Sequence, residues 1–358
     1  MLKNTLLFLL LALACSCATG NQAKQSTPRH FPADSPLLRY TGRIDFRNPT
    51  RPRAYQPGVY MEAAFQGPSC RIIVRDQQLW GSNQNYLEVV VDGQSRRIQT
   101  TGSTDTIKIA DGLPDGLHQL LVCKNTEANI GWLEFGGIIC QELLPPPSAP
   151  KRKIEFIGNS ITCGTGADTS EVPCGKGKWQ DQHNAYLSYG PLTARALNAQ
   201  WHISAVSGIG IVRSCCDMDI LMPQVFDNID MRGDSLEWDF SEYQPDVVTI
   251  CLGQNDGVQD SVKFCGAYVQ FIETLRRYYP RAQIVCLTSP MGDARLTAVL
   301  KNYLTGVVEE MHRRGDKKVD QFFFSRQFSS GCDYHPNLAE HAEMAEELTA
   351  FLKGEMGW

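Results

Sequence analysis

A short proline-rich segment, Pro145-Pro146-Pro147-Ser148-Ala149-Pro150, divides the chain into two halves with different hydrophobic patterns. Such a segment is stiff and continues neither a helix nor a central strand, so it indicates a domain boundary. The chain has 358 residues, which is enough for about two domains. We therefore expect one domain over residues 37–145 and a second over residues 151–358.

The first half consists of short apolar runs separated by turn signals. Residues 86–91 form one such run and are followed by Asp92-Gly93, a strong hairpin signal. No helical period of useful length occurs between residues 38 and 144. Short strands at this spacing predict a β-sandwich of the jelly-roll type.

In the second half, apolar runs that resemble strands alternate with helical stretches. The candidate strands are residues 154–157, 202–206, 247–252, 284–287 and 319–324. Apolar residues repeat every three or four positions over 264–275 and 296–311, which is typical of helices with one core-facing side. Residues 338–351 predict a terminal helix. This alternation predicts an α/β domain, with a parallel sheet covered by helices on both faces.

The N-terminus has the features of an export signal. Lys3 precedes an apolar run at residues 6–14, which is too short to cross a bilayer and ends at Cys15-Ser16-Cys17. A cysteine at the cleavage point resembles a bacterial lipoprotein signal, in which it becomes the lipid-modified first residue. We expect a lipoprotein-type signal peptide over residues 1–17 and a polar linker over residues 18–36. Cys15 and Cys17 both remain candidate lipidation sites, and a plain cleaved signal peptide is the alternative.

The expected protein is therefore exported and held at the bacterial cell envelope, with membrane contact only through its lipid anchor. Composition excludes other classes: 34 Lys and Arg against 39 Asp and Glu give a net charge of −5, which argues against a nucleic-acid binder. Hydrophobic residues at 42% fit a globular protein. The seven His residues form no metal-ligand cluster, so we expect no metal site.

Cysteine usage adds limited information on pairing. Of the 13 cysteines, those outside the signal segment are odd in number and cannot all pair within one chain. Cys251 and Cys286 lie in strand-like runs and are expected to be buried thiols. Cys163 and Cys174 could close a short loop in an exported protein, although sequence does not determine pairing.

Reactive or polarising groups follow four of the predicted strands, at their carboxyl ends. The four segments are Gly158-Asn159-Ser160, Ser207-Gly208, Gly253-Gln254-Asn255-Asp256 and Asp333-Tyr334-His335. Each alone has an ordinary structural interpretation, since a serine after a strand is usually a helix cap and Ser-Gly is usually a turn. Together, at one edge of one sheet, they supply the nucleophile, base and oxyanion donors that acyl transfer needs.

These four segments resemble the conserved blocks of the SGNH/GDSL hydrolase superfamily. The resemblance implies Ser160 as nucleophile and His335 as general base. It also implies an oxyanion hole formed by the main-chain N–H groups of Ser160 and Gly208 and the side chain of Asn255. Asn159 stands where Asp is more usual. The Gly-x-Ser-x-Gly elbow of α/β-hydrolases is absent around Ser160, which argues against the α/β-hydrolase fold.

A jelly-roll domain before an SGNH domain resembles carbohydrate esterase family 2, and the resemblance covers residues 38–353. Lys124-Asn125-Thr126-Glu127 and Gly331-Cys332-Asp333-Tyr334-His335-Pro336 are similar to its motifs. The resemblance implies a serine esterase that removes acetyl groups from plant polysaccharides such as xylan and glucomannan without a cofactor. Its partner would be an acetylated polysaccharide or oligosaccharide. The alternatives are an SGNH lipase or arylesterase with another substrate, and a non-catalytic surface lipoprotein that binds glycans.

The orienting partner of His335 is open to two interpretations. The superfamily places an Asp three residues before the His, whereas here Asp333 stands two before it. Residues two apart in an extended segment point to the same side, so we expect the Asp333 carboxylate to contact His335. A main-chain carbonyl, as in some members of the resembling family, is the alternative.

Two aromatic residues are candidate platforms for the apolar face of a sugar ring. Trp179 lies in a polar loop and Tyr334 stands next to the predicted base. A tryptophan folded onto its own domain is the competing interpretation for Trp179. For Asp256 we expect a loop-bracing carboxylate, and for His341 a position on a helix surface.

Overall fold

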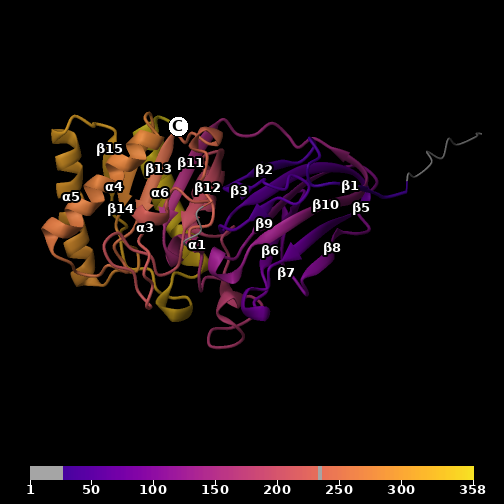
Figure 1. Cartoon of the computed structure of the whole chain (residues 1–358), viewed down its shortest axis with the longest axis horizontal. Coiled ribbons are helices and arrows are strands. Elements are labelled where there is room, and N and C mark those ends of the chain that lie inside the picture. The colour runs from indigo at the N-terminus through magenta and orange to yellow at the C-terminus, as the bar shows by residue number, and fades with distance from the viewer. Residues whose placement is uncertain (1–26, 233–235) are drawn as a thin grey trace, which may run out of the picture.

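A computed structural model describes residues 27–232 and 236–358 of the chain (Figure 1). The predicted signal peptide and the first part of the predicted linker lie outside the described residues. An antiparallel β-rich domain and an α/β domain stand side by side, as the colour change along the chain in Figure 1 shows. The predicted fold class is confirmed.

Within the described residues, ten antiparallel strands make up the first domain. They are β1 (Arg29–Phe31), β2 (Arg39–Thr41), β3 (Ile44–Asp45), β4 (Arg53–Ala54), β5 (Tyr60–Asp76), β6 (Tyr86–Val91), β7 (Gln94–Gln99), β8 (Thr104–Ala110), β9 (Leu117–Lys124) and β10 (Leu133–Leu144). The long strand β5 organises the domain, because it pairs with β9 along its first half, with β8 along its second and with β10 along most of its length. Its buried side chains, such as Phe65 and Ile72, lie in the core of this domain.

Two local predictions for this domain can be compared with the structure. Asp92 and Gly93 form the β6–β7 turn with φ values of 50° and 80°, as the predicted hairpin requires. The predicted linker over 18–36 is wrong at its end, because Arg29–Phe31 forms β1 and pairs with β10. Phe31 packs against the core of the β-rich domain, so apolar burial brings this part of the polar stretch into the sheet.

The second domain contains a parallel sheet that, among the described residues, has five strands in the order β12-β11-β13-β14-β15. The strands are β11 (Arg152–Gly158), β12 (Ala199–Ala205), β13 (Val247–Cys251), β14 (Gln283–Leu287) and β15 (Val319–Phe322). The helices are α1 (Ser160–Cys163), α2 (Tyr189–Ala196), α3 (Met222–Val225), α4 (Ser261–Tyr278), α5 (Ala294–Arg313) and α6 (Leu338–Met356). Short 3-10 helices occur at η1 (Leu79–Gly81), η2 (Ala128–Ile130), η3 (Trp179–Gln182), η4 (Phe240–Glu242) and η5 (Cys332–Tyr334).

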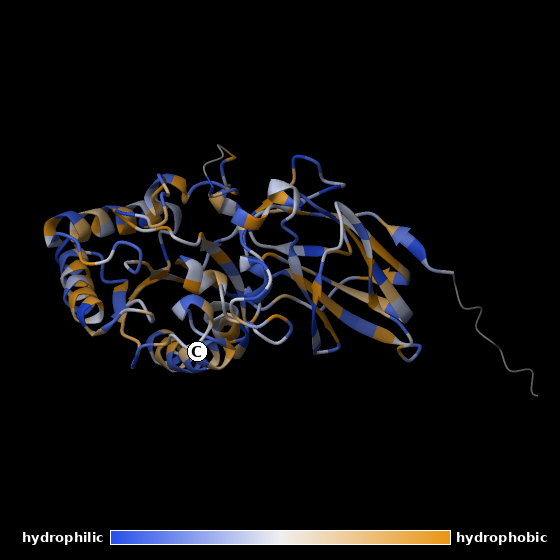
Figure 2. Ribbon diagram, turned by 90° about the horizontal axis from the view of Figure 1, so that it is seen from below, coloured by the Kyte–Doolittle hydropathy of each residue, from blue (hydrophilic) through white to orange (hydrophobic). Residues whose placement is uncertain are grey.

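Helices cover both faces of this sheet, as the sequence pattern predicts. Buried residues of α4 and α5 pack with Val248, Ile250 and Ile284 on one face. Residues of α2 and α6 pack with Phe156 and Val285 on the other. Orange apolar positions recur among blue polar ones along these helices and along the strands of the β-rich domain (Figure 2). Among the described residues, no helix is both long and apolar enough to cross a bilayer.

The two domains are joined by buried polar contacts. Arg43 of the β-rich domain pairs with Glu155 on β11 at 2.9 Å, and both side chains are fully buried. The indole N–H of Trp201 on β12 donates to the Gly58 carbonyl at 2.9 Å. Asn125, directly after β9, accepts the Tyr186 N–H on its side-chain oxygen. These contacts make the β-rich domain part of the framework that supports the α/β domain.

Candidate active site

The strand order places a crevice at the carboxyl ends of β11, β12 and β13. From β11 the chain passes to β12 on one side and later returns to β13 on the other side of β11. Such a switch point is where open α/β sheets bind ligands. Ser160 begins α1 directly after β11 and is 8% exposed. Asn159 caps this helix by accepting the Ile161 N–H at 3.2 Å. Because Ser160 is the first helical residue, its own N–H has no acceptor within the helix.

The segment after β12 carries the predicted oxyanion donor Gly208. Gly208 has φ +88°, and a Cβ there would lie 3.1 Å from the Sγ of Cys215. Its carbonyl accepts the Cys215 N–H at 2.8 Å, while its own N–H donates to no described residue. The hydroxyls of Thr165 and Ser207 hydrogen-bond at 3.1 Å, which joins this segment to the chain that follows α1.

The segment after β13 braces the same loop. The side-chain amide of Asn255 donates to the Ile209 carbonyl at 2.9 Å, which places it against the segment of Gly208. Asp256 is fully buried and accepts main-chain N–H groups of Ile211, Val212 and Arg213. The expectation that Asp256 is a loop-bracing carboxylate is confirmed.

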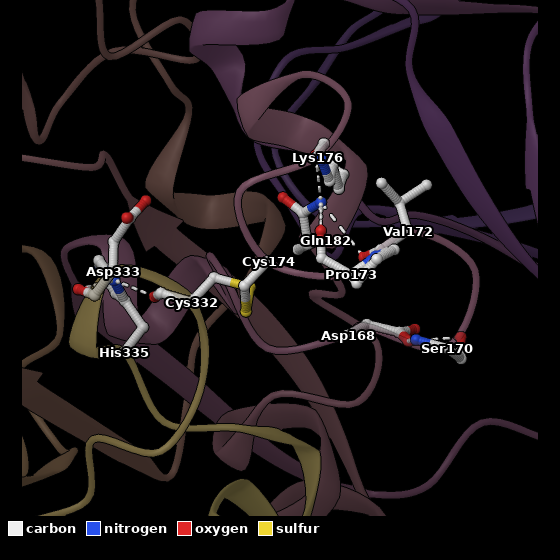
Figure 3. The surroundings of a disulfide bond; sticks show 10 residues. All are labelled: Asp168, Ser170, Val172, Pro173, Cys174, Lys176, Gln182, Cys332, Asp333 and His335. Carbon is white, nitrogen blue, oxygen red and sulfur yellow. Dashed lines mark hydrogen bonds between the residues drawn. A yellow bond between two sulfur atoms is a disulfide. The ribbon is translucent and has the colours of Figure 1, made fainter.

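His335 is held by the main chain rather than by a carboxylate. Its Nδ1 lies 3.2 Å from the Cys332 carbonyl oxygen and 3.1 Å from that of Asp333. Figure 3 shows the Asp333 carboxylate pointing away from the imidazole. The expected carboxylate contact is therefore wrong, and residue 333 contributes through its carbonyl. The reason is local: Asp333 and Tyr334 have φ values of 51° and 60°, so the segment is a tight turn and not the extended chain that the expectation assumed.

These contacts settle the protonation pattern of the imidazole. Two carbonyl acceptors at Nδ1 require the proton on that atom, which leaves Nε2 as the basic nitrogen. Burial lowers the pKa of His335 below its ordinary value, and the two carbonyl hydrogen bonds partly oppose this shift. Among the described residues, neither Nε2 nor the Ser160 hydroxyl forms a hydrogen bond to protein. Both remain available to a substrate, as is common before the substrate binds.

The turn carrying His335 is fastened to the chain that leaves Ser160. Thr165 N–H bonds back to the Ser160 carbonyl at 3.0 Å, and the next residue, Gly166, accepts the Cys332 N–H at 2.9 Å. The N–H of Leu338 donates to the Ala167 carbonyl at 3.1 Å. The fold thus brings the four predicted segments together at one edge of the sheet. The individual roles of Ser160, Gly208, Asn255 and His335 remain predictions.

The disulfide pairing differs from the one considered for the sequence. Cys174 bonds to Cys332 and ties the loop after α1 to the His335 turn (Figure 3), whereas Cys163 is a buried free thiol. The suggested Cys163–Cys174 loop is wrong because Cys163 is enclosed on α1 and faces Glu127. Cys251 and Cys286 are buried thiols as predicted. A second disulfide joins the neighbouring residues Cys215 and Cys216.

The two candidate sugar platforms are both accessible. Trp179 is 43% exposed, and its ring packs edge-on against His183 with centroids 4.4 Å apart. Tyr334 is 80% exposed. Their substrate-binding roles remain predictions. His341, in contrast, is not on a helix surface: it is fully buried where α6 packs on α2, and its Nδ1 accepts the Tyr189 N–H.

One buried side chain at this edge has no role in the sequence analysis. Glu127, from the β-rich domain, accepts the Ser207 N–H at 2.8 Å. The sequence did contain a signal for this residue, because Glu127 is the last residue of the Lys124–Glu127 motif that resembles the family's N-terminal domain. A motif match does not reveal which domain its side chain enters.

Comparison with known proteins shows the family to which the chain belongs. Residues 40–147 match the family "Carbohydrate esterase 2 N-terminal", and residues 156–342 match the "GDSL-like Lipase/Acylhydrolase family". A solved family two carbohydrate esterase from Clostridium thermocellum, in complex with cellohexaose, is 35% identical with a TM-score of 0.82, covering 90% of this chain and 99% of that one. The chain belongs to carbohydrate esterase family 2. It is a serine ester hydrolase of the carbohydrate esterase type.

Further relatives of this family 2 esterase differ in length. A family two carbohydrate esterase from Cellvibrio japonicus has a TM-score of 0.84 at 26% identity, covering 93% of this chain and 99% of that one. "Cellulase/esterase CelE" of Acetivibrio thermocellus is 36% identical over 341 residues, which are 91% of this chain and only 40% of CelE. "Acetylxylan esterase / glucomannan deacetylase" of Cellvibrio japonicus is 27% identical over 96% of both chains.

Proposed function

We propose that this esterase removes O-acetyl groups from plant polysaccharides such as xylan and glucomannan. The observation that carries the proposal is the meeting of four segments at one sheet edge, the segments that contain Ser160, Gly208, Asn255 and His335. The likeness over 96% of both chains to a protein named acetylxylan esterase and glucomannan deacetylase supports the substrate class.

The first half of the reaction transfers the acetyl group to the enzyme. His335 Nε2 takes the proton of the Ser160 hydroxyl as Oγ attacks the acetyl carbonyl carbon. The developing oxyanion receives hydrogen bonds from the N–H groups of Ser160 and Gly208 and from the Asn255 amide. The bond between the acyl carbon and the sugar oxygen breaks, and the imidazolium gives its proton to this oxygen, which leaves as a free hydroxyl. The product is a deacetylated sugar and an acetyl-Ser160 ester.

The second half regenerates the enzyme with water. His335 removes a proton from water as it attacks the acetyl-Ser160 carbonyl, and the same donors stabilise the second oxyanion. Collapse releases acetate, and the imidazolium protonates Ser160 Oγ. The carbonyls of Cys332 and Asp333 keep Nε2 directed at the reacting atoms throughout.

A substrate panel tests this proposal. Released acetate is measured from acetylated xylan and acetylated glucomannan, and nitrophenol from nitrophenyl acetate, butyrate and octanoate, with Ser160→Ala as the inactive control. We expect release from both polysaccharides and a rate on acetate far above that on butyrate. Equal turnover of the acetate and octanoate esters would instead favour a lipase-like enzyme. Glycan binding without release of any acyl group would favour the non-catalytic alternative.

We also propose export to the bacterial cell envelope, with a lipid anchor on Cys15 or Cys17. The support is the sequence of residues 1–17 together with the Cys174–Cys332 disulfide, since disulfides persist in oxidising compartments. Metabolic labelling with a fatty-acid analogue tests the anchor. The label is expected in the membrane fraction and lost in the Cys15→Ala, Cys17→Ala double variant, whereas an unlabelled soluble product contradicts it.

A further inference from the structure

A carboxylate from the β-rich domain enters the active site of its neighbour. Glu127 lies between β9 and η2 and is fully buried. Its Oε2 accepts the main-chain N–H of Ser207 at 2.8 Å and faces the Cys163 thiol at 3.8 Å. Ser207 directly precedes the oxyanion residue Gly208, and Cys163 lies on the helix that begins with Ser160. The carboxylate therefore sits where the nucleophile helix and the oxyanion segment meet.

The hydrogen bonds around Gly208 show what this contact does. The peptide that carries the Gly208 N–H lies between two others that are anchored. On one side the Ser207 N–H is held by Glu127, and on the other the Gly208 carbonyl is held by the Cys215 N–H at 2.8 Å. A charged acceptor forms a stronger and better directed bond than a neutral one. The orientation of the oxyanion N–H thus depends on a side chain from another domain.

The surroundings of Glu127 fix its position. Lys124 is fully buried, and its Nζ donates to the main-chain carbonyls of Thr126 and Glu127 at 2.5 and 3.2 Å. The neighbouring Asn125 accepts the Tyr186 N–H at 3.1 Å. Burial raises the pKa of Glu127, and hydrogen bonds from Ser207 and the charge of Lys124 oppose this shift. A carboxylate in such a place is costly unless it is hydrogen-bonded, and within the described residues its Oε1 has no partner.

We propose that Glu127 is a positioning residue, through which the β-rich domain holds the oxyanion hole of the esterase in its productive geometry. The proposal rests on the proposed function for the role of Gly208. Glu127 does not touch the substrate. It acts through the Ser207 N–H, so its loss affects the stabilisation of the transition state more than the binding of substrate.

Paired substitutions separate this role from general stabilisation. Glu127→Met fills the same space without an acceptor, whereas Glu127→Gln keeps an oxygen that can accept the Ser207 N–H. Asn125→Leu is the matched control, because it removes a buried side-chain acceptor of a main-chain N–H in the same segment, but at a loop without an oxyanion donor. Steady-state kinetics with nitrophenyl acetate and the melting temperature are measured for all three.

We expect kcat of Glu127→Met to fall by about 100-fold with KM little changed, as for a misplacement near 1 Å. Glu127→Gln should restore most of kcat. Asn125→Leu should lower the melting temperature while keeping kcat near that of the wild type. If Glu127→Met does not fold, Glu127→Asp replaces it. Its side chain is one methylene shorter, so the carboxylate lies further from the Ser207 N–H, and kcat must show the same loss.

Three outcomes overturn the proposal: wild-type kcat in Glu127→Met or in Glu127→Asp, no rescue by Glu127→Gln, or an equal loss of kcat in Asn125→Leu. The rate at which a fluorophosphonate probe labels Ser160 gives a second readout, since it needs the same oxyanion donors but no natural substrate. A wild type that hydrolyses nitrophenyl acetate but no acetylated polysaccharide contradicts the proposed substrate and leaves the test of Glu127 intact.

Discussion

The Nδ1 of His335 lies 3.1 Å from the main-chain carbonyl oxygen of Asp333, in the turn that both residues share. Together with the Cys332 carbonyl, this contact fixes the tautomer and the direction of the ring. A carbonyl supplies no full negative charge to stabilise the imidazolium, unlike the carboxylate of a triad. The geometry therefore favours a Ser160–His335 pair over a triad that includes the Asp333 side chain.

Removing the Asp333 carboxylate should therefore have a small effect. Asp333→Asn is the suitable change, because Asn tolerates the left-handed backbone at φ 51°. We expect kcat to fall by less than about tenfold, against the roughly 10,000-fold loss seen when a triad Asp is altered. Steady-state kinetics with nitrophenyl acetate measure it. A loss of kcat by several orders of magnitude at unchanged KM would instead show that the Asp333 carboxylate is the third member of a catalytic triad.

The acid limb of the pH profile should lie below the usual range for a histidine base. Burial lowers the pKa of His335, and the base acts only while Nε2 is unprotonated. Activity is then retained as the pH falls to about 6.5, the ordinary histidine value, and is lost below it. The profile of kcat/KM with nitrophenyl acetate checks this, with circular dichroism at each pH to exclude unfolding. A midpoint above pH 7 is incompatible with it.

The Cys174–Cys332 disulfide should support both stability and catalysis. Cys332 provides one of the carbonyls that hold His335, and its disulfide crosses to the loop after α1. Cys174→Ser should lower the free energy of unfolding by about 2–5 kcal/mol and also reduce kcat. Denaturant unfolding and kinetics measure the two effects. Cys265→Ser, a partly exposed free thiol on α4, is the control and should change neither; an unaltered kcat in Cys174→Ser contradicts the catalytic part.

Features that depend on interactions between residues close in sequence could be predicted from the sequence, whereas features that depend on distant residues could not. The five strands and the apolar stripes of α4 and α5 were predictable, because each depends on a local period of burial. Ser160, Gly208 and Asn255 were placed correctly at the sheet edge, since parallel strands carry their carboxyl ends to the same side. The expectations that failed depend on non-local or unusual backbone features.

Asp333 and Tyr334 illustrate such a feature. Both are non-glycine residues with positive φ, and no local sequence pattern predicts that conformation. The partner of Cys174 lies 158 residues away, beyond any spacing rule. His341 and Glu127 are polar residues buried by packing between helices or domains, and their polarity alone indicates a surface position.

Trp179 should affect polymeric substrates more than small ones. Its indole is 43% exposed beside His183, and we take the roughly 0.5–1.5 kcal/mol of an aromatic pair as the scale for its proposed contact with the apolar face of a sugar ring. Trp179→Ala should therefore raise KM for acetylated xylan roughly two- to tenfold and leave nitrophenyl acetate kinetics unchanged. Phe46→Ala, a similarly exposed aromatic of the β-rich domain, is the control. An equal change in the KM for acetylated xylan in both variants would contradict a role of Trp179 in substrate binding.

The central claim is that Ser160 and His335 act as one catalytic unit at the edge of the parallel sheet. The most direct measurement compares acetate release from acetylated xylan by the wild type, Ser160→Ala, His335→Ala and the double variant, with folding confirmed for each. Each single variant should lose nearly all activity, and the double variant should be little worse than either, because groups that act together are not additive. Near wild-type activity in folded Ser160→Ala, or losses in the two single variants that multiply in the double variant, would contradict the account.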